Sequence, residues 1–361
     1  MTAPLAVRDA VPLAPLTTLE LGGPARHFVE ATDDGAIADA LSWADGRGLP
    51  VLILGGGSNV VIADRGWDGL VIRIATRGRR FDAAGGEVTL TAAAGEPWDD
   101  VVADTVARGL AGLECLSGIP GLVGATPIQN VGAYGQEVAD TIRSVKVLDR
   151  ASKQVIELAP AACAFGYRDS AFKHAPDRHV VLAVTFGLRP GGAPALRYRE
   201  LADALAGAAQ PTLAEVRATV LALRRKKSMV IVEGDPNRRS VGSFFMNPIV
   251  PAAQADAVAA RAVALGAIAR PDEMPRWPAD GGVKLSAGWL IERAGIRKGH
   301  RRGAVGVSSA HALALVHHGG GSTAALLALA QEVGDAVHAQ FAMTLMPEPA
   351  MIGVEWPRPQ R

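Results

Sequence analysis

Two uncharged, glycine-rich loops contain the residues best suited to hold a nucleotide-like ligand. The first, Gly55–Asn59 (GGGSN), directly follows the apolar run at residues 50–54. Consecutive glycines let backbone N–H groups converge on an anion without obstruction by side chains, so this loop can cradle a pyrophosphate. A triple glycine is equally typical of a simple turn. No helix and no GxGxxG pattern follows it, which disfavours a Rossmann site.

The second loop, Ile119–Gly135 (IPGLVGATPIQNVGAYG), contains two prolines, four glycines and no charged residue. This composition argues against a regular helix or a central strand. A stiff, neutral loop suits close contact with a flat, uncharged ring system. Thr126, Gln129 and Asn130 offer hydrogen-bond donors and acceptors to such a ring. A buried structural crossover is the alternative interpretation.

The elements that must position these loops are a mixture of helices and strands. Hydrophobic periodicity predicts helices at residues 36–48, 97–110, 212–227, 285–294 and 323–340, and strands at 50–54, 60–63, 70–74, 88–92, 145–148, 155–158, 180–186 and 312–316. Pro- and Gly-rich segments at 189–194 and 270–282 predict loops or boundaries, and His317-His318 beside three glycines predicts a turn. Helices and strands do not alternate cleanly, so we expect an α+β fold rather than a doubly wound sheet.

Composition excludes several classes of protein. The 37 basic residues nearly cancel the 36 acidic ones among 361 residues, which argues against nucleic acid or anionic lipid as a partner of the whole chain. The two cysteines cannot form a disulfide framework, which favours a reducing cytoplasm. We find no signal-peptide pattern, no apolar run of the ~20 residues that span a bilayer, and no metal-ligand spacing among the eight histidines. The sequence therefore predicts a soluble, cytoplasmic protein without a metal.

A resemblance to a known family becomes specific when further motifs are added to the two loops. The motifs occur in order along nearly the whole chain: LGGPA (21–25), LILGGGSNVVI (52–62), IPGLVGATPIQNVGAYG (119–135), GYRDSAFK (166–173), GSFFMNP (242–248), VKLSAGWLIERAG (283–295) and PEP (347–349). Together they resemble the MurB flavoenzymes, the UDP-N-acetylenolpyruvoylglucosamine reductases of peptidoglycan synthesis. Tyr198 resembles the tyrosine of the mobile loop that is typical of the type I subgroup.

The resemblance implies both a fold and a reaction. The fold is a PCMH-type FAD-binding domain of the vanillyl-alcohol-oxidase superfamily at 14–200, with subdomains of roughly 14–76 and 77–200. A smaller α/β substrate-binding domain follows at 211–343, and a C-terminal segment, 344–361, returns to the FAD side. The reaction is reduction of UDP-N-acetylglucosamine enolpyruvate to UDP-N-acetylmuramate through FAD, with NADPH as hydride donor. The expected partners are these small molecules, and the expected state is a monomer.

Three residues match the catalytic positions of the family. Arg168 corresponds to an arginine that stabilises charge developing on the substrate carboxylate, Ser243 to the proton donor, and Glu348 to a second acid. From the residues alone, a surface ion pair with Asp169 is the favoured interpretation of Arg168, and ordinary turns are the favoured interpretation of Ser243 and Glu348; the match to the family motifs reverses this preference.

The resemblance implies further binding residues. The expected FAD contacts are Leu54, Gly55, Gly56, Gly57, Ser58, Asn59, Ile119, Pro120, Gly121, Gly124, Ala125, Thr126, Pro127, Gln129, Asn130, Gly132, Ala133 and Tyr134. The expected substrate contacts are Tyr167, Tyr198, Arg224, Lys227, Asn247 and His311. The chain departs from some relatives in having His311 in place of a glutamine and Ala350 in place of an arginine, and the choice between Lys226 and Lys227 stays open.

Two other functions remain as alternatives at this point. One is a different flavoprotein of the same fold that oxidises an alcohol or amine, which would be supported by a histidine or cysteine placed to attach FAD covalently. The other is a non-catalytic protein that binds a flavin or a UDP-sugar. The combination of Arg168, Ser243 and Glu348 argues against the second, because a binding protein does not need all three.

Overall fold

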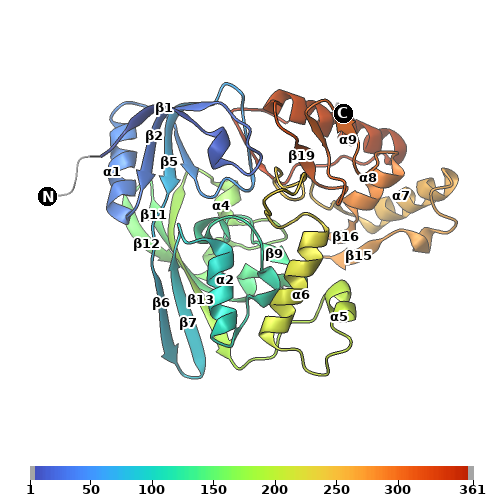
Figure 1. Cartoon of the computed structure of the whole chain (residues 1–361), viewed down its shortest axis with the longest axis horizontal. Helices are drawn as coiled ribbons and strands as arrows, with labels where there is room; N and C mark the ends of the chain where they lie inside the picture. Colours follow the sequence, from blue (N-terminus) through green and yellow to red (C-terminus); the bar gives the residue numbers. More distant parts are fainter. Residues whose placement is uncertain (1–4, 357–361) are drawn as a thin grey trace. The chain divides into compact units, whose positions relative to one another are not determined.

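A computed structural model describes residues 5–356. The chain forms two compact units, each assembled from separate stretches of sequence (Figure 1). The first unit contains residues 5–11, Ala25–Gly57 and Trp67–Val230, and the second contains Pro12–Pro24, Ser58–Gly66 and 231–356. Helices and strands mix in both units, which confirms the α+β prediction.

The amino-terminal part of the first unit is a four-stranded sheet with one helix. The strand order is β1 (Arg8–Pro12), β2 (Pro24–Ala31), β5 (Trp67–Ile74) and β3 (Val51–Leu54), with β5 parallel to both β2 and β3. Helix α1 (Asp34–Asp45) begins where the Asp33 carboxylate accepts a hydrogen bond from Ala36 N at 2.8 Å. Its buried residues Ile37 and Leu41 share a core with Leu70 of β5. The parallel strands deliver the Gly55–Gly57 loop at the carboxyl end of β3.

The rest of the first unit is built on a five-strand antiparallel path. The order is β12 (Gln154–Leu158), β11 (Ile142–Asp149), β13 (His179–Pro190), β7 (Glu87–Ala93) and β6 (Arg79–Ala84), and β8 (Leu110–Ala111) also pairs with β13. Helix α2 (Trp98–Ala107) inserts Trp98 against Phe186, with ring centroids 5.7 Å apart. The Trp98 indole N–H donates to Leu116 O at 3.1 Å, so its polar atom is satisfied within the core.

The predicted loop at 189–194 is wrong at its start. Strand β13 continues to Pro190, and Arg189 and Pro190 pair with Ala111 and Leu110. Proline is tolerated there because it occupies the last position of a strand, where a lost N–H donor is inexpensive.

Short elements connect the larger ones in this unit. They are α3 (Pro160–Cys163), α4 (Ala171–His174), β9 (Gly132–Ala133), β10 (Gln136–Glu137), α5 (Arg199–Ala204) and α6 (Leu213–Lys226), with 3-10 turns at Glu114–Leu116, Val123–Ala125 and Val138–Asp140. Helix α6 begins at a capping box in which Thr212 Oγ1 accepts from Glu215 N and Glu215 accepts from Thr212 N. This confirms the helix predicted at 212–227.

The second unit combines small sheets with three longer helices. The sheets are β14 (Ile249–Val250), β16 (Gly282–Leu285) and β15 (Arg276–Ala279); β17 (Arg301–Arg302), β18 (Val305–Val307) and β19 (Leu315–His317); and β20 (Ala350–Ile352) parallel to β4 (Val60–Ile62). The helices are α7 (Ala252–Ala264), α8 (Ala287–Arg293) and α9 (Thr323–Phe341), and 3-10 turns lie at Ala14–Leu16 and Pro271–Glu273. No helix within residues 5–356 is long and apolar enough to cross a membrane.

Two local predictions in this unit are wrong. The segment 270–282 contains strand β15, which pairs with β16 across a tight turn. His317 is the last residue of β19 rather than part of a turn, and its buried ring accepts a hydrogen bond from Gly321 N and contacts Leu19 O. The second error arises because the His317 ring is held by a group distant in sequence, Leu19 O, which local composition does not reveal.

Candidate active site

The two glycine-rich loops predicted from sequence lie against each other in the first unit. A Cβ atom added to Gly56 would lie 2.9 Å from Gly121 Cα, closer than real Cβ atoms approach. At Gly55 an added Cβ would make only an ordinary contact, 3.8 Å from Leu122 Cδ1. Glycine at position 56 is therefore required by the close approach of two backbones, at a position that is itself exposed.

The Ile119–Gly135 loop is anchored by Ala94, the residue that follows β7, and has unusual backbone conformations near its end. Gly124 N donates to Ala94 O at 2.8 Å, and Thr126 uses its hydroxyl to cap Val123 O at 2.8 Å. Asn130 and Tyr134 adopt positive φ angles of 44° and 49°. Such angles are uncommon outside glycine and mark a loop whose shape is determined by its surroundings.

Arg168 lies at the tip of a tight hairpin that faces this loop. Gly166 and Asp169 exchange two backbone hydrogen bonds, of 3.0 and 3.2 Å, and Arg168 between them has a φ of 54°. The Arg168 guanidinium donates to Gly132 O at 2.5 Å and to Asn130 O at 3.4 Å. The Asp169 carboxylate instead lies 2.9 Å from His174 Nε2. The geometry therefore directs Arg168 to the predicted FAD loop, and Asp169 to a different neighbour.

Four of the residues predicted to bind FAD or substrate form one cluster in the first unit. The rings of Tyr134 and Tyr198 meet edge to face, with centroids 5.5 Å apart, and Lys227 Nζ lies 5.9 Å from the Tyr134 centroid. Lys227 also forms a 2.5 Å ion pair with Glu200, a residue that the sequence analysis missed. Arg224 is half-buried beside them, and its Nε atom is fully buried. A signal for Glu200 existed in its position two residues after Tyr198.

Burial changes the protonation behaviour of this cluster. Desolvation lowers the pKa of Arg224, although nearby Tyr134 and Asp99 oppose the change. Burial also raises the pKa of Tyr134 to about 12, so its hydroxyl stays protonated as a donor at neutral pH. Arg224 Nη2 donates to Met229 O at 2.6 Å, whereas its buried Nε has no hydrogen-bond partner within the described part of the chain. A buried, incompletely satisfied guanidinium suits an anionic ligand.

Ser243 and Glu348 are brought together in the second unit by backbone pairing. Glu348 N donates to Phe244 O at 2.8 Å, Phe245 forms a β-bridge with Pro347, and Phe244 N donates to Leu313 O at 2.7 Å. Gly242, immediately before Ser243, has a φ of 75°, which a residue with a side chain rarely adopts. The buried rings of Phe244 and Phe245 pack edge to face, so the pairing is fixed by a core rather than by an exposed turn.

Of the three remaining predicted substrate contacts, Tyr167 lies in the first unit, with its ring centroid 5.4 Å from Arg168 Cζ, and Asn247 and His311 lie in the second unit. The Asn247 side-chain oxygen accepts a hydrogen bond from Ala287 N, at the start of α8, at 2.9 Å. His311 Nδ1 accepts from Leu313 N at 3.0 Å, and Leu313 in turn holds Phe244. Both residues therefore support the segment that carries Ser243.

Comparison with known proteins places this arrangement in a family. Residues 25–159 match the profile of the FAD binding domain, and residues 235–352 match that of the UDP-N-acetylenolpyruvoylglucosamine reductase C-terminal domain. The chain is 54% identical to the UDP-N-acetylenolpyruvoylglucosamine reductase of Saccharopolyspora erythraea over 94% of each protein. It is 50% identical to that of Streptomyces coelicolor over 95% of this chain and 89% of the relative. The chain belongs to the UDP-N-acetylenolpyruvoylglucosamine reductase family.

A solved structure agrees with this assignment at the level of fold. The reductase (MurB) from Thermus caldophilus superposes with a TM-score of 0.66 over 96% of this chain and 99% of that one, at 24% identity. The expected fold, a PCMH-type FAD-binding domain followed by the C-terminal domain of the reductase family, is confirmed. The fit to FAD is tested independently at Gly56, where the close approach to Gly121 excludes a side chain, as in the glycine-rich loops whose backbone N–H groups bind a pyrophosphate.

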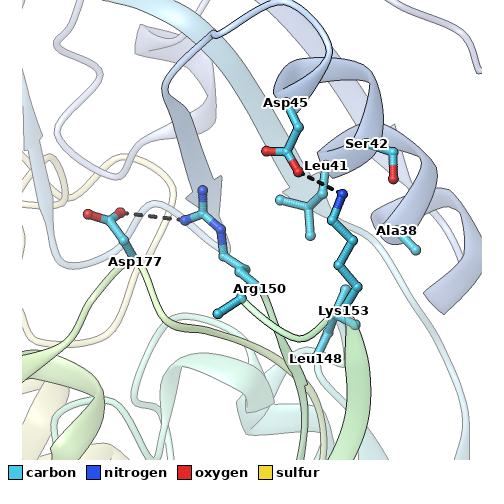
Figure 2. Close-up of a pocket in the computed structure, with 9 residues that line it drawn as sticks. Ala38, Leu41, Ser42, Asp45, Leu148, Arg150, Lys153 and Asp177 are labelled. Carbon is cyan, nitrogen blue, oxygen red and sulfur yellow. Dashed lines mark hydrogen bonds and ion pairs between the residues drawn. The ribbon is translucent and has the colours of Figure 1, made fainter.

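A separate cavity of about 310 Å³ lies between α1 and the turn after β11 (Figure 2). Its charged residues are already paired, Arg150 with Asp177 at 3.5 Å and Lys153 with Asp45 at 3.1 Å. None of its lining residues belongs to the predicted reductase site. The cavity is therefore distinct from the site of the reaction.

Proposed function

We propose that this chain catalyses the NADPH-dependent reduction of UDP-N-acetylglucosamine enolpyruvate to UDP-N-acetylmuramate in peptidoglycan precursor synthesis. The observation that carries the proposal is sequence identity of 50% and 54% to two reductases of this name, over most of the length of each protein. The chain also matches the profiles of the FAD binding domain and of the reductase C-terminal domain. The enzyme is an FAD-dependent oxidoreductase. Bound FAD supplies the hydride that it takes from NADPH, and the residues of the chain provide the binding, the charge stabilisation and the proton.

Arg168 is proposed to stabilise the negative charge that develops on the substrate when the enol ether is reduced. Its guanidinium remains protonated at any physiological pH and can form paired hydrogen bonds to a carboxylate. The two carbonyls of the 119–135 loop that it contacts orient it without neutralising it. An arginine held in one direction by neutral acceptors keeps its full charge for the substrate.

Ser243 is proposed to donate the proton to C2 of the enolpyruvyl group, with Glu348 as the second acid. A serine hydroxyl is a weak acid in water, so this role needs a dry site in which charge on the donor is stabilised. The buried Phe244 and Phe245 that follow Ser243 support exclusion of water. The hydrogen bond from Glu348 N to Phe244 O supports joint action, because it holds the two acidic groups on adjoining segments.

The cluster around Tyr134 is proposed to bind the nucleotide end of the substrate. Arg224 and Lys227 would meet the diphosphate, and Tyr198 would close over it, as in the type I subgroup. The 2.5 Å pair between Lys227 and Glu200 supports a competition in which the diphosphate replaces the Glu200 carboxylate. Tyr167, Asn247 and His311 are proposed as further substrate contacts, and the glycine-rich loops as the FAD contacts.

The oligomeric state of the enzyme, its location and the roles of its domains are also proposals. We propose that the enzyme works as a monomer in the cytoplasm, with residues 14–200 binding FAD, residues 211–343 binding the substrate and residues 344–361 completing the FAD site. The pairing of β20 with β4, which begins just after Asn59, supports the role of the C-terminal segment. Size-exclusion chromatography with light scattering would contradict the monomer if the mass were that of two chains.

Half-reaction spectroscopy of Ser243→Ala tests the proposed function. We expect the purified variant to be yellow and to be bleached by NADPH at the wild-type rate, because Ser243 does not take part in hydride transfer to FAD. Reoxidation by the enolpyruvyl substrate should slow by at least 10³-fold, since the proton donor is missing. Wild-type protein that bleaches but is not reoxidised by this substrate would overturn the proposed activity. Wild-type activity in Ser243→Ala would overturn only the assignment of Ser243.

A further inference from the structure

The hairpin that carries Arg168 adopts a conformation that its own residues do not favour. An arginine at a φ of 54° is in the left-handed region, which costs roughly 1 kcal/mol or more for a residue with a side chain. Such a conformation persists only where neighbouring groups hold it. The direction of the Arg168 side chain therefore depends on whatever fixes the Gly166–Asp169 turn.

The Asn130 side chain helps to fix this turn from the neighbouring loop, together with Ile128 O, which accepts a hydrogen bond from the Ser170 hydroxyl. Asn130 is buried, and its Nδ2 donates to Gly166 O at 3.0 Å, the carbonyl that also receives Asp169 N. The backbone carbonyl of Asn130 accepts from the Arg168 guanidinium at 3.4 Å. One residue thus contacts both the base of the hairpin and the side chain at its tip.

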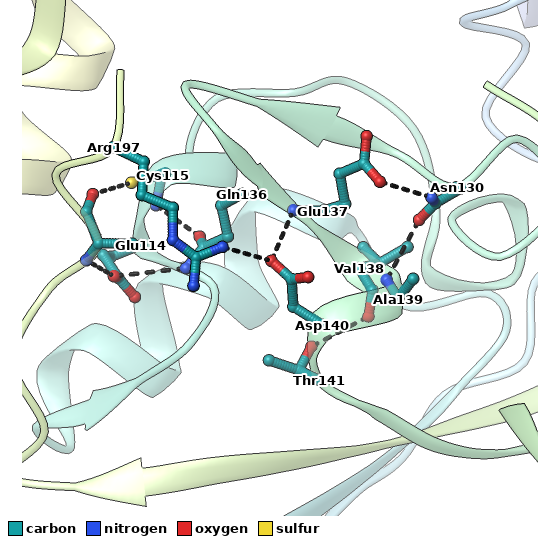
Figure 3. Close-up of polar contacts among 11 residues, drawn as sticks. Glu114, Cys115, Asn130, Gln136, Glu137, Val138, Ala139, Asp140, Thr141 and Arg197 are labelled. Carbon is teal, nitrogen blue, oxygen red and sulfur yellow. Dashed lines mark hydrogen bonds and ion pairs between the residues drawn. The ribbon is translucent and has the colours of Figure 1, made fainter. Parts of the chain in front are cut away.

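Glu137 determines which way the Asn130 amide points. Its Oε2 accepts the second Nδ2 hydrogen at 2.7 Å, while Asn130 Oδ1 accepts from Ala139 N at 3.1 Å (Figure 3). An ionised carboxylate can only accept hydrogen bonds, so it selects the orientation in which the amide nitrogen, and not the oxygen, faces Gly166 O. A flipped amide would set two oxygens against each other at that position.

The backbone around Glu137 places its carboxylate between the two loops. Glu137 is opposite Gly132 in the β9–β10 pair, and a Cβ added to Gly132 would lie 2.8 Å from Glu137 Cγ and 3.0 Å from Arg168 Nη1. The Glu137 amide donates to Asp140 Oδ2 at 3.3 Å, which secures this residue at the start of the following turn (Figure 3). The chain of contacts from Glu137 through Asn130 to the Arg168 hairpin lies entirely within the first unit.

We propose that Glu137 is a positioning residue for the reductase reaction, acting through the Asn130 amide to hold the Arg168 hairpin. This inference rests on the proposed role of Arg168. Glu137 itself needs no contact with the substrate. The role requires a hydrogen-bond acceptor at the end of a side chain as long as that of glutamate. The length of the side chain is therefore more important than its charge.

Three substitutions of Glu137 distinguish the effect of side-chain length from the effect of charge. Glu137→Gln keeps an acceptor at the same distance. The rate at which the substrate reoxidises the reduced flavin of this variant should be within about threefold of the wild-type rate. Glu137→Ala removes the acceptor, and Glu137→Asp retracts it by one methylene. Both should slow reoxidation by substrate 10- to 100-fold, since small misplacements of a catalytic group cost rate on that order. The rate at which NADPH bleaches the flavin should stay within twofold of the wild-type rate in all three variants. Glu157→Ala, on the exposed part of β12, is the matched control.

Hydrogen–deuterium exchange provides a readout that does not depend on activity. In Glu137→Ala and Glu137→Asp, amides in residues 164–170 should exchange at least tenfold faster than in wild type, with or without FAD. Glu137→Gln and Glu157→Ala should match wild type in this segment. If Glu137→Ala fails to fold, the difference between Glu137→Asp and Glu137→Gln still tests the positioning role of Glu137.

The outcomes distinguish failure of this inference from failure of the proposed function. Equal slowing of both half-reactions, or glutamine behaving like alanine, would contradict the positioning role of Glu137. Normal reoxidation of Glu137→Ala alongside a slow Arg168→Lys would contradict it as well, while leaving the reductase intact. Wild-type protein that is never reoxidised by the enolpyruvyl substrate would instead overturn the function on which the inference rests.

Discussion

At the scale of single residues, Asp99 and Arg224 of the first unit differ in how their charges are paired. Asp99 accepts a bidentate pair from Arg217, at 2.6 and 2.8 Å, and a backbone hydrogen bond from Gly118 at 2.6 Å. Arg224 Nε, by contrast, is buried and has no hydrogen-bond partner within residues 5–356, although Asp99 acts on the Arg224 guanidinium through space. An uncompensated buried guanidinium is costly unless function requires it, and anion binding is such a requirement.

Asp99 predicts a pH-dependent contribution to stability. Burial raises the pKa of Asp99, but the hydrogen bonds from Arg217 and Gly118 outweigh it, so the pKa lies below 3.8. A lowered folded-state pKa means that the stabilisation is present above the unfolded value and is lost as pH falls through the folded one. Asp99→Asn should therefore lower the urea midpoint at pH 7, and the difference from wild type should shrink below pH 4. A difference that grew on acidification would contradict the pairing.

At the scale of elements, the two glycine-rich loops depend on one close backbone contact. Gly56→Ala places a methyl group 2.9 Å from Gly121 Cα, so the loops must separate. We expect a loss of roughly 1–3 kcal/mol of stability, as for other overpacked sites, and a marked loss of bound FAD. Gly207→Ala, outside both loops, is the matched control, because a Cβ added there has no heavy atom within 4 Å. FAD content from the visible spectrum and unfolding by urea measure both effects. Equal behaviour of the two variants would refute the contact.

At the scale of the whole molecule, each unit has its own apolar core. The first is built around residues such as Leu70, Trp98 and Phe186, and the second around Phe244, Leu290 and Phe341. Gly55–Gly57, the 119–135 loop and Arg168 belong to the first unit, while Ser58, Asn59, Ser243 and Glu348 belong to the second. Most of the proposed FAD contacts and the proposed proton donor are thus supported by different cores.

A core substitution in the second unit tests this division. Leu290 is fully buried, and Leu290→Ala should cost about 2–5 kcal/mol. We expect the variant, at a temperature where it is folded, to bind FAD and to be bleached by NADPH, because the glycine-rich cradle is unchanged. Differential scanning calorimetry measures the loss of stability, and the flavin spectrum measures binding. A variant that folds but has lost its FAD would contradict the separation of the two roles.

Local sequence predicted much of the scaffold and most of the chemistry. Helices α1 and α6 and strand β3 were predicted because apolar periodicity, and for the helices a suitable end, lies within each segment. The absence of charge and the density of glycine in Ile119–Gly135 were enough to predict a loop of special shape. The order of the motifs was enough to predict the reductase family.

Tertiary structure alone decided how those parts act on one another. The sequence contains no sign that Glu137 orients Asn130 or that Arg168 adopts a positive φ against the preference of its residue type. It also missed the end of β13 and the burial of His317, which depend on pairing with distant strands. Periodicity and turn composition report energies between near neighbours in the chain. Hydrogen bonds between loops depend on where the whole fold places them, and that is decided only when the chain packs.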